Sequence, residues 1–161
     1  EPNKTIADPA CGTGGFFLSA YEFLTKNTEA PLDKDAKSFL KNSTFHGNEI
    51  VANTRRMCMM NMFLHNIGEI DKESLISSND ALIAPSPLTL DYVLANPPFG
   101  KKSSMSFTNE EGEQEKEELT YNRQDFWATT SNKQLNFLQH ICSMLKTTGK
   151  AAVVVPDNVL F

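Results

Sequence analysis

The sequence lacks any long apolar segment. It contains no uninterrupted apolar run of about 18 residues, which excludes a membrane-spanning helix. Residues 1–4 carry no basic stretch that leads into an apolar one, so we expect no secretory signal peptide. No internal repeat is visible either. We therefore expect a cytoplasmic protein without a membrane partner.

Cysteine is scarce, and its spacing fits neither a disulfide framework nor a metal site. The three cysteines are Cys11, Cys58 and Cys142. An odd number of widely separated thiols is typical of a reducing cytoplasm. No Cys-x-x-Cys or His-x-x-x-His pair accompanies them, so we expect no bound metal.

An excess of positive charge is also missing. The formal net charge is −5, which argues against binding nucleic acid through bulk positive charge. Residues 109–119 hold six glutamates and one lysine, so this segment carries the whole negative excess. It lies in an insertion, residues 101–132, that we expect to form a long, acidic, irregular loop. The rest of the chain is neutral, and charge therefore neither excludes nor supports a DNA partner.

Apolar runs alternate with segments of helical periodicity, as in an α/β protein. With 161 residues and 40% hydrophobic content, the chain has enough apolar surface for one domain over residues 1–161. We expect a doubly wound, mostly parallel sheet with helices on both faces. The strands are expected at 5–7, 45–50, 74–77, 90–95 and, as a buried strand, 151–155; the helices are expected from 16, around 34–41, at 51–67 and at 135–145, the last ended by Thr147-Thr148-Gly149.

A glycine-rich loop, Asp8-Pro9-Ala10-Cys11-Gly12-Thr13-Gly14-Gly15, links the first strand to a helix. Its glycines let the backbone approach a ligand, and the helix N-terminus favours an anion. The loop lacks the Gly-Lys-Ser/Thr ending of a phosphate-binding loop. The nearest acidic residue at a strand end, Glu49, follows Gly15 by 34 positions, too far for the usual dinucleotide fingerprint. Asp8 instead suits a ligand with an ammonium or sulfonium charge.

Two further acidic residues follow expected strands. Glu49 is placed to accept hydrogen bonds from ribose hydroxyls, or else to favour the start of the next helix. The Asn79-Asp80 pair is placed to accept from an adenine amino group through a carboxylate or amide oxygen, or else to form a turn. His46 is expected to be a core or partly buried histidine rather than a ligand.

The tetrapeptide Asn96-Pro97-Pro98-Phe99 ends the apolar run 90–95. Two consecutive prolines cannot continue a central strand, because each lacks an N–H and has a fixed φ. An amide, rigid carbonyls and an aromatic ring therefore lie at the carboxyl end of a buried strand, where open α/β sheets bind ligands. A simple turn is the alternative. Four side chains after the acidic run either contact a substrate or fold back onto the body: Tyr121, Arg123, Phe126 and Trp127.

Together these motifs resemble the S-adenosylmethionine-dependent amino-methyltransferases. Within that class the chain resembles the modification subunits of type I restriction–modification systems, which methylate adenine N6 in DNA. The resemblance runs from the glycine loop through Glu49, Asp80 and the tetrapeptide to residues 136–140 and 150–157. It implies a Rossmann-like sheet truncated at both ends, forming part of a catalytic domain. It also implies S-adenosyl-L-methionine as cofactor, and double-stranded DNA, a specificity subunit and a restriction subunit as partners.

The resemblance also implies residue roles. Asn96 Oδ1 and the Pro97 carbonyl would accept the two N–H bonds of a flipped-out adenine, with Phe99 stacked on the base. The glycine loop would hold the methionine end of the cofactor, Glu49 the ribose and Asp80 the adenine ring. The implied catalytic set is Asn96, Pro97, Pro98 and Phe99; the implied cofactor-binding set is Asp8, Pro9, Cys11, Gly12, Thr13, Gly14, Gly15, Phe16, Glu49, Ile50, Asp80, Ala81 and Asn96.

Other functions stay open at this point. Methyltransferases that modify a glutamine of release factors share the motif but usually carry tyrosine where Phe99 stands. RNA adenine is another conceivable acceptor. A cofactor-binding fragment without activity belongs to a different class, and we expect these 161 residues alone to turn over weakly or not at all. An NAD-dependent oxidoreductase is disfavoured by the position of Glu49.

Overall fold

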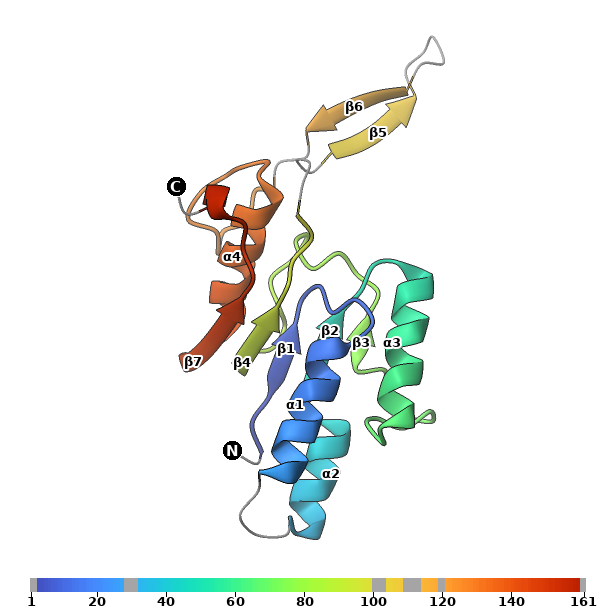
Figure 1. Cartoon of the computed structure of the whole chain (residues 1–161). Helices are drawn as coiled ribbons and strands as arrows, with labels where there is room; N and C mark the ends of the chain where they lie inside the picture. Colours follow the sequence, from blue (N-terminus) through green and yellow to red (C-terminus); the bar gives the residue numbers. More distant parts are fainter. Residues whose placement is uncertain (1–2, 28–31, 100–103, 109–113, 119–120, 160–161) are drawn as a thin grey trace.

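The computed structural model describes residues 3–27, 32–99, 104–108, 114–118 and 121–159 (Figure 1). Its main feature is a five-stranded parallel sheet with the order β3-β2-β1-β4-β7. The predicted doubly wound α/β architecture is therefore confirmed. The strands are β1 (Ile6–Asp8), β2 (Phe45–Asn48), β3 (Ile76–Ser77), β4 (Leu90–Ala95) and β7 (Leu145–Val153).

Helices cover both faces of the sheet, as predicted. Alternate side chains of a strand point to opposite faces. Ile6 of β1 accordingly belongs to the core shared with three helices, whereas the neighbouring Ala7 packs with Ile141 and Met144 of the fourth. The first three helices are α1 (Gly15–Lys26), α2 (Lys34–Asn42) and α3 (Ala52–Leu64); the fourth is α4 (Lys133–Met144).

The helix ends follow from local side-chain chemistry. Asp33 caps α2 by accepting a hydrogen bond from Ala36 N at 2.7 Å. Asn132 caps α4 by accepting from Gln134 N and Leu135 N at 3.0 and 3.1 Å. Helix α3 ends at Leu64, three residues before the predicted end. The predicted stop signal holds, because Asn66 and Gly68 adopt left-handed φ angles of 61° and 78°.

Asp91 ties three strands together at their amino ends. Its Oδ2 accepts hydrogen bonds from Thr5 N and Oγ1 at 3.0 and 2.9 Å, just before β1. Lys146 of β7 donates to the same oxygen at 2.9 Å. These bonds hold the pKa of the Asp91 carboxyl well below its usual range, the Lys146 bond having the largest effect. The opposite, carboxyl edge is left for the loops.

The expectation of an irregular loop over 101–132 is wrong in part. Strands β5 (Ser104–Thr108) and β6 (Gln114–Glu118) form an antiparallel ribbon within it, with Ser106 opposite Lys116. Ser104 to Thr108 alternates polar and apolar residues, a strand pattern that the neighbouring charge run obscures. The acidic run falls partly on β6 and partly outside the described residues.

The expectation of a buried strand over 151–155 is also corrected. Strand β7 begins at Leu145, directly after α4, so Thr147-Thr148-Gly149 does not form the helix stop. The pairing shifts between Leu90–Leu145 and Tyr92–Lys150, and the extra residues form a bulge. Ala151 and Ala152 are exposed. Because β7 lies at the edge of the sheet in the described chain, it lacks the second neighbour that a central strand has.

Candidate active site at the carboxyl edge of the sheet

The strand order reverses between β1 and β4. From β1 the chain moves outward to β2 and β3, then returns to β4 beside β1 and continues to β7 on the other side (Figure 1). Loops that leave β1 and β4 therefore diverge, and such a switch point is where open α/β sheets bind ligands. The glycine loop follows β1 and the Asn96 tetrapeptide follows β4, so the two main sequence motifs meet here.

A cavity of about 380 Å³ lies at this edge. Its walls come from the carboxyl ends of β1, β2, β3 and β4 and from the start of α4. It is lined by predicted site residues, namely Pro9, Glu49, Ile50, Asp80, Ala81, Asn96 and Pro98, and by residues that the sequence reasoning did not select, namely Ala10, Asn48, Val51, Asn79, Lys133 and Phe137.

The other predicted residues lie outside this lining. Asp8, Cys11 and Pro97 are buried, whereas Phe16 and Phe99 are exposed. The remaining ones belong to the turn into α1; they are Gly12, Thr13, Gly14 and Gly15. The structure thus brings Glu49, Asp80 and Asn96 to one cavity. Of the glycine loop, only Pro9 and Ala10 line it.

Asp8 is an acid in an apolar setting. It is 2% exposed, and its Oδ1 accepts a hydrogen bond from Ala10 N at 2.9 Å. Burial is the main reason that its pKa rises to about 7, and the negative charge of Glu49 acts in the same direction. Buried Cys11 also has a raised pKa; its thiol lies 3.9 Å from that of Cys58. Asp8 therefore changes charge near neutral pH, and a cation beside it would favour its ionised form.

The glycine loop is packed tightly against α3. Gly12 and Gly14 have φ angles of 55° and 85°, which favour glycine. A Cβ on Gly14 would lie 2.9 Å from Cys58 Sγ. Asn61 Nδ2 donates to Thr13 O at 3.0 Å, and this bond fixes the loop from the same helix. Gly14 supplies no side-chain cap to α1, so the first N–H groups of that helix stay available to a ligand.

Glu49 and Asp80 each accept a local backbone hydrogen bond and also line the cavity. Glu49 Oε1 accepts from Val51 N at 2.7 Å, as an acid at a helix start does, yet Glu49 also lines the cavity. Asp80 Oδ1 accepts from Leu82 N at 2.9 Å in a turn, and Asp80 lines the same cavity. An ionised carboxylate has about four acceptor sites, so each group keeps capacity for a ligand.

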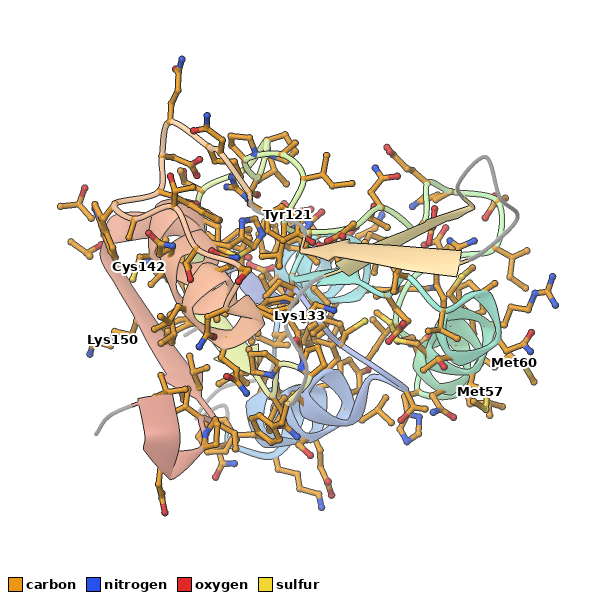
Figure 2. The ribbon with its side chains drawn as sticks, turned by 90° about the horizontal axis from the view of Figure 1, so that it is seen from above. Met57, Met60, Tyr121, Lys133, Cys142 and Lys150 are labelled. Atoms are coloured by element: carbon orange, nitrogen blue, oxygen red, sulfur yellow. The ribbon has the colours of Figure 1, made fainter. Side chains whose placement is uncertain are left out.

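Three of the four side chains after the acidic run fold back onto the body. Tyr121 and Arg123 are buried, and the guanidinium carbon of Arg123 lies 4.1 Å from the centre of the Phe126 ring. Trp127 is 78% exposed. Seen from the carboxyl edge in Figure 2, Tyr121 and Lys133 lie over the middle of the molecule, whereas Met57 and Met60 lie at its rim on α3.

The missed cavity residues left different signals in the sequence. Asn48 directly precedes Glu49, so strand-end position alone could have included it; Asn79 was considered together with Asp80 but was left out of the cofactor-binding set. Lys133 and Phe137 are four residues apart on α4 and share a helix face. Whether they line the cavity depends on where α4 begins relative to β4, and nothing in the local sequence indicates this. Lys133 is the single cation among the residues lining this cavity.

Comparison with known proteins places this arrangement in a family. The family model described as N-6 DNA methylase matches residues 1–161. The chain belongs to the N-6 DNA methylase family. Methyltransferases of this family use S-adenosylmethionine.

The most similar relatives include methylase subunits of type I restriction enzymes. The chain is 37% identical over 166 residues to the StySPI methylase subunit of Salmonella potsdam and equally to the EcoKI methylase subunit of Escherichia coli K12. Each match covers 100% of this chain and 28% of the relative. The crystal structure of the EcoKI M protein matches with a TM-score of 0.76 and 36% identity, over 99% of this chain and 31% of that one. The chain thus spans less than a third of the curated relatives' length.

Two features are absent from the residues that the structure describes. No helix among them is long and apolar enough to cross a membrane. Among the same residues, no group of three or more His, Cys, Asp or Glu side chains is arranged to hold a metal ion.

Proposed function

We propose that this chain is the catalytic domain of a modification subunit that transfers a methyl group from S-adenosylmethionine to adenine N6 in duplex DNA. One observation carries the proposal: in a chain of this family, a single cavity at the switch point is lined by Asn96 and Pro98 together with Glu49 and Asp80. Residues 1–161 would form one partial domain, with 101–132 as an insertion in it.

The residues present fit the cofactor. S-adenosylmethionine, when bound, supplies an electrophilic methyl group on a sulfonium centre. Asp8, Glu49 and Asp80 offer acceptors for its ammonium group, ribose hydroxyls and adenine amino group. The open N–H groups at the start of α1 suit its carboxylate. Pro9, Ile50, Ala81 and Phe137 supply apolar wall to this cavity, as the flat adenine ring requires.

Asn96 and Pro97 would activate the acceptor nitrogen. The lone pair of an adenine amino group is delocalised into the ring, so the nitrogen is a poor nucleophile. Asn96 Oδ1 and the Pro97 carbonyl, accepting its two N–H bonds, would favour a pyramidal nitrogen with its lone pair directed at the methyl group. Pro97 and Pro98 have fixed φ angles and hold these acceptors in place. Catalysis would then rest on placement and oriented dipoles, without a covalent enzyme intermediate.

Phe99 would support the target base. Its ring is 52% exposed, so a face is available for stacking. Stacking of a base on an aromatic side chain contributes about 1–3 kcal/mol. A duplex adenine has to leave the base stack to reach a cavity, and this contact would offset part of the cost of flipping it.

The partners follow from the relatives and from the charge. The relatives above are named as methylase subunits of type I restriction enzymes, which supports a specificity and a restriction subunit as partners. With a formal charge of −5, this chain has no bulk positive charge with which to hold duplex DNA. We propose that DNA affinity and sequence recognition come from outside these residues, within a cytoplasmic complex.

The deciding experiment measures methyl transfer. The full-length protein that carries this chain, with its specificity subunit, is incubated with tritiated S-adenosylmethionine and duplex DNA. We expect label on adenine N6, and a loss of at least about 100-fold in kcat for Asn96→Ala. Label on RNA adenine or on a release-factor glutamine instead would reassign the acceptor. Cofactor binding without transfer to any of the three would make the protein a binding subunit.

A further inference from the structure

Tyr121 and Arg123 connect the insertion to the cavity. Both lie within the insertion, in the segment after β6 by which the chain returns to the body, and they are 7% and 8% exposed. Tyr121 Oη donates a hydrogen bond to Asp80 Oδ2 at 3.3 Å. Tyr121 also packs with Leu82 and Phe137 in a small core that lies under the cavity wall. The segment returning from the insertion therefore reaches the Asp80 loop through both polar and apolar contacts.

Arg123 holds the backbone of the same loop. Its Nη1 donates to the carbonyls of Ala81 and Leu82, each at 3.3 Å. The guanidinium is itself fixed by a two-point ion pair with Asp125. Arg123 Nη1 also lies 3.1 Å from His140 Nδ1, and since a guanidinium can only donate, this ring nitrogen accepts. Burial and the Arg123 charge lower the pKa of His140 to about 4, so the ring is neutral at physiological pH.

Helix α4 fixes this segment from the other side. Gln139 Oε1 accepts from Ala128 N at 2.8 Å, and Gln139 Nε2 donates to Ala128 O at 3.0 Å. Asn136 Nδ2 donates to Thr130 O at 2.8 Å. Gln139 and Asn136 are both buried. The polar side chains of α4 thus serve as a clamp for residues 128–130, which leaves the Asp80 contacts little freedom to shift.

The Asp80 carboxylate is consequently oriented through both of its oxygens. Leu82 N fixes Oδ1 and Tyr121 fixes Oδ2, and each oxygen keeps a lone pair for a ligand. We propose that Tyr121 and Arg123 are positioning residues for Asp80, through which the segment returning from the insertion sets how tightly the cavity binds the adenine ring of its cofactor. The inference rests on the role proposed above for Asp80.

The test is a double-mutant cycle on cofactor binding. Calorimetry measures the Kd of S-adenosylhomocysteine for the full-length protein and for Tyr121→Phe, which removes only the hydroxyl. We expect about fivefold weaker binding for Tyr121→Phe, the effect of one hydrogen bond. In an Asp80→Ala background the same substitution should have no further effect. Tyr21→Phe on α1 is the matched control and should leave the Kd unchanged.

Kinetics separate positioning from general stability. Tyr121→Phe should raise the KM for S-adenosylmethionine and leave kcat unchanged, whereas Asn96→Ala lowers kcat. Arg123→Lys keeps the charge but loses the several N–H donors of the guanidinium, and it should raise KM further. If this variant fails to fold, Tyr121→Phe carries the test alone.

Three results would overturn the inference. They are an unchanged Kd for Tyr121→Phe, a Tyr121→Phe effect that persists in the Asp80→Ala background, and an equal loss in Tyr21→Phe. Absence of S-adenosylhomocysteine binding by the unsubstituted protein would instead overturn the proposed function.

Discussion

At the scale of single residues, Asp8 shows how burial sets chemistry. Its folded pKa of about 7 lies above the ordinary value of 3.8. Below about pH 4 the carboxyl is protonated in both the folded and the unfolded chain. Between pH 4 and 7 the folded chain keeps a proton that the unfolded chain has lost, so the free energy of unfolding falls as the pH rises. Above pH 7 this contribution is constant.

Asp8→Asn should therefore stabilise the ligand-free protein at pH 8. Asparagine imitates the protonated carboxyl and keeps an acceptor for Ala10 N. The gain should shrink by about 1 kcal/mol per pH unit as the pH falls from 7 toward 4. Urea unfolding of both proteins across this range measures the difference. An Asp8→Asn protein that is less stable at pH 8 and equally so at pH 5 would contradict the argument.

The same substitution should weaken cofactor binding. A cationic ligand favours the ionised Asp8, so the Kd for S-adenosylmethionine should fall as the pH rises from 6 to 7 and then level off. Asp8→Asn should bind more weakly and without this pH dependence. Glu49, Cys11 and Cys58 are the other titratable groups that act on Asp8 or lie beside it. Calorimetry at several pH values in the two proteins separates their effects from that of Asp8.

The positions of polar residues were predictable where they follow a strand end. Glu49, Asp80 and Asn96 were selected from position and side-chain type, and the structure brings all three to one cavity. The clamp of Asn136 and Gln139 was not predictable, because buried polar residues break the apolar pattern of a helix. The apolar periodicity of α4 correctly points to Ile141, which is buried, but it also points to Leu135 and Cys142, which are exposed. What buries a polar side chain here is a distant loop, and no local signal reveals it.

At the scale of elements, the turn between β1 and α1 offers a graded test. Gly14→Ala should lower the free energy of unfolding by about 2 kcal/mol, because a left-handed backbone and a contact with Cys58 Sγ both oppose the new methyl group. Gly12→Ala meets no neighbour within 4 Å and should cost about 1 kcal/mol, from backbone strain alone.

Gly15→Ala is the matched control in this turn. Gly15 begins α1, has no left-handed φ, and would meet no atom within 4 Å. Alanine is the better helix former, so its stability should be unchanged or slightly increased. Thermal or urea unfolding of the three variants measures the order of their stabilities. Equal losses at Gly12 and Gly14 would show that the contact with α3 contributes nothing.

Elements with a regular apolar pattern were predicted well, whereas elements whose bounds depend on pairing with another strand were not. Strand β4 matches its predicted range of 90–95, because a largely apolar run is followed by Asn96 and two prolines. Strand β7 differs, since its start at Leu145 and its bulge depend on pairing with β4. The β5–β6 ribbon depends in the same way on pairing between two segments, which composition does not show.

At the scale of the whole molecule, activity should require more than these residues. We expect the 161-residue chain alone to transfer little or no label to duplex DNA, because it is acidic and spans 28% of its relatives' length. Tritium transfer by the chain alone is compared with transfer by the full-length protein and its specificity subunit. Steady methylation of duplex DNA by the isolated chain would contradict this expectation.

The overall architecture was predictable because alternating strands and helices permit few topologies. The strand order, with β1 between β2 and β4, is what turns separate motifs into one site. That order is a property of the assembled sheet. The sequence suggests it only through resemblance to a family.

The single tryptophan also gives the molecule a spectroscopic property. Trp127 is 78% exposed and sits two residues from Asp125, the carboxylate that fixes Arg123. Because its indole is already in water, its fluorescence should change little when the core melts. Coverage of this loop by another molecule would remove that water and shift the emission to the blue. This chain therefore carries an intrinsic reporter of docking at the Trp127 loop.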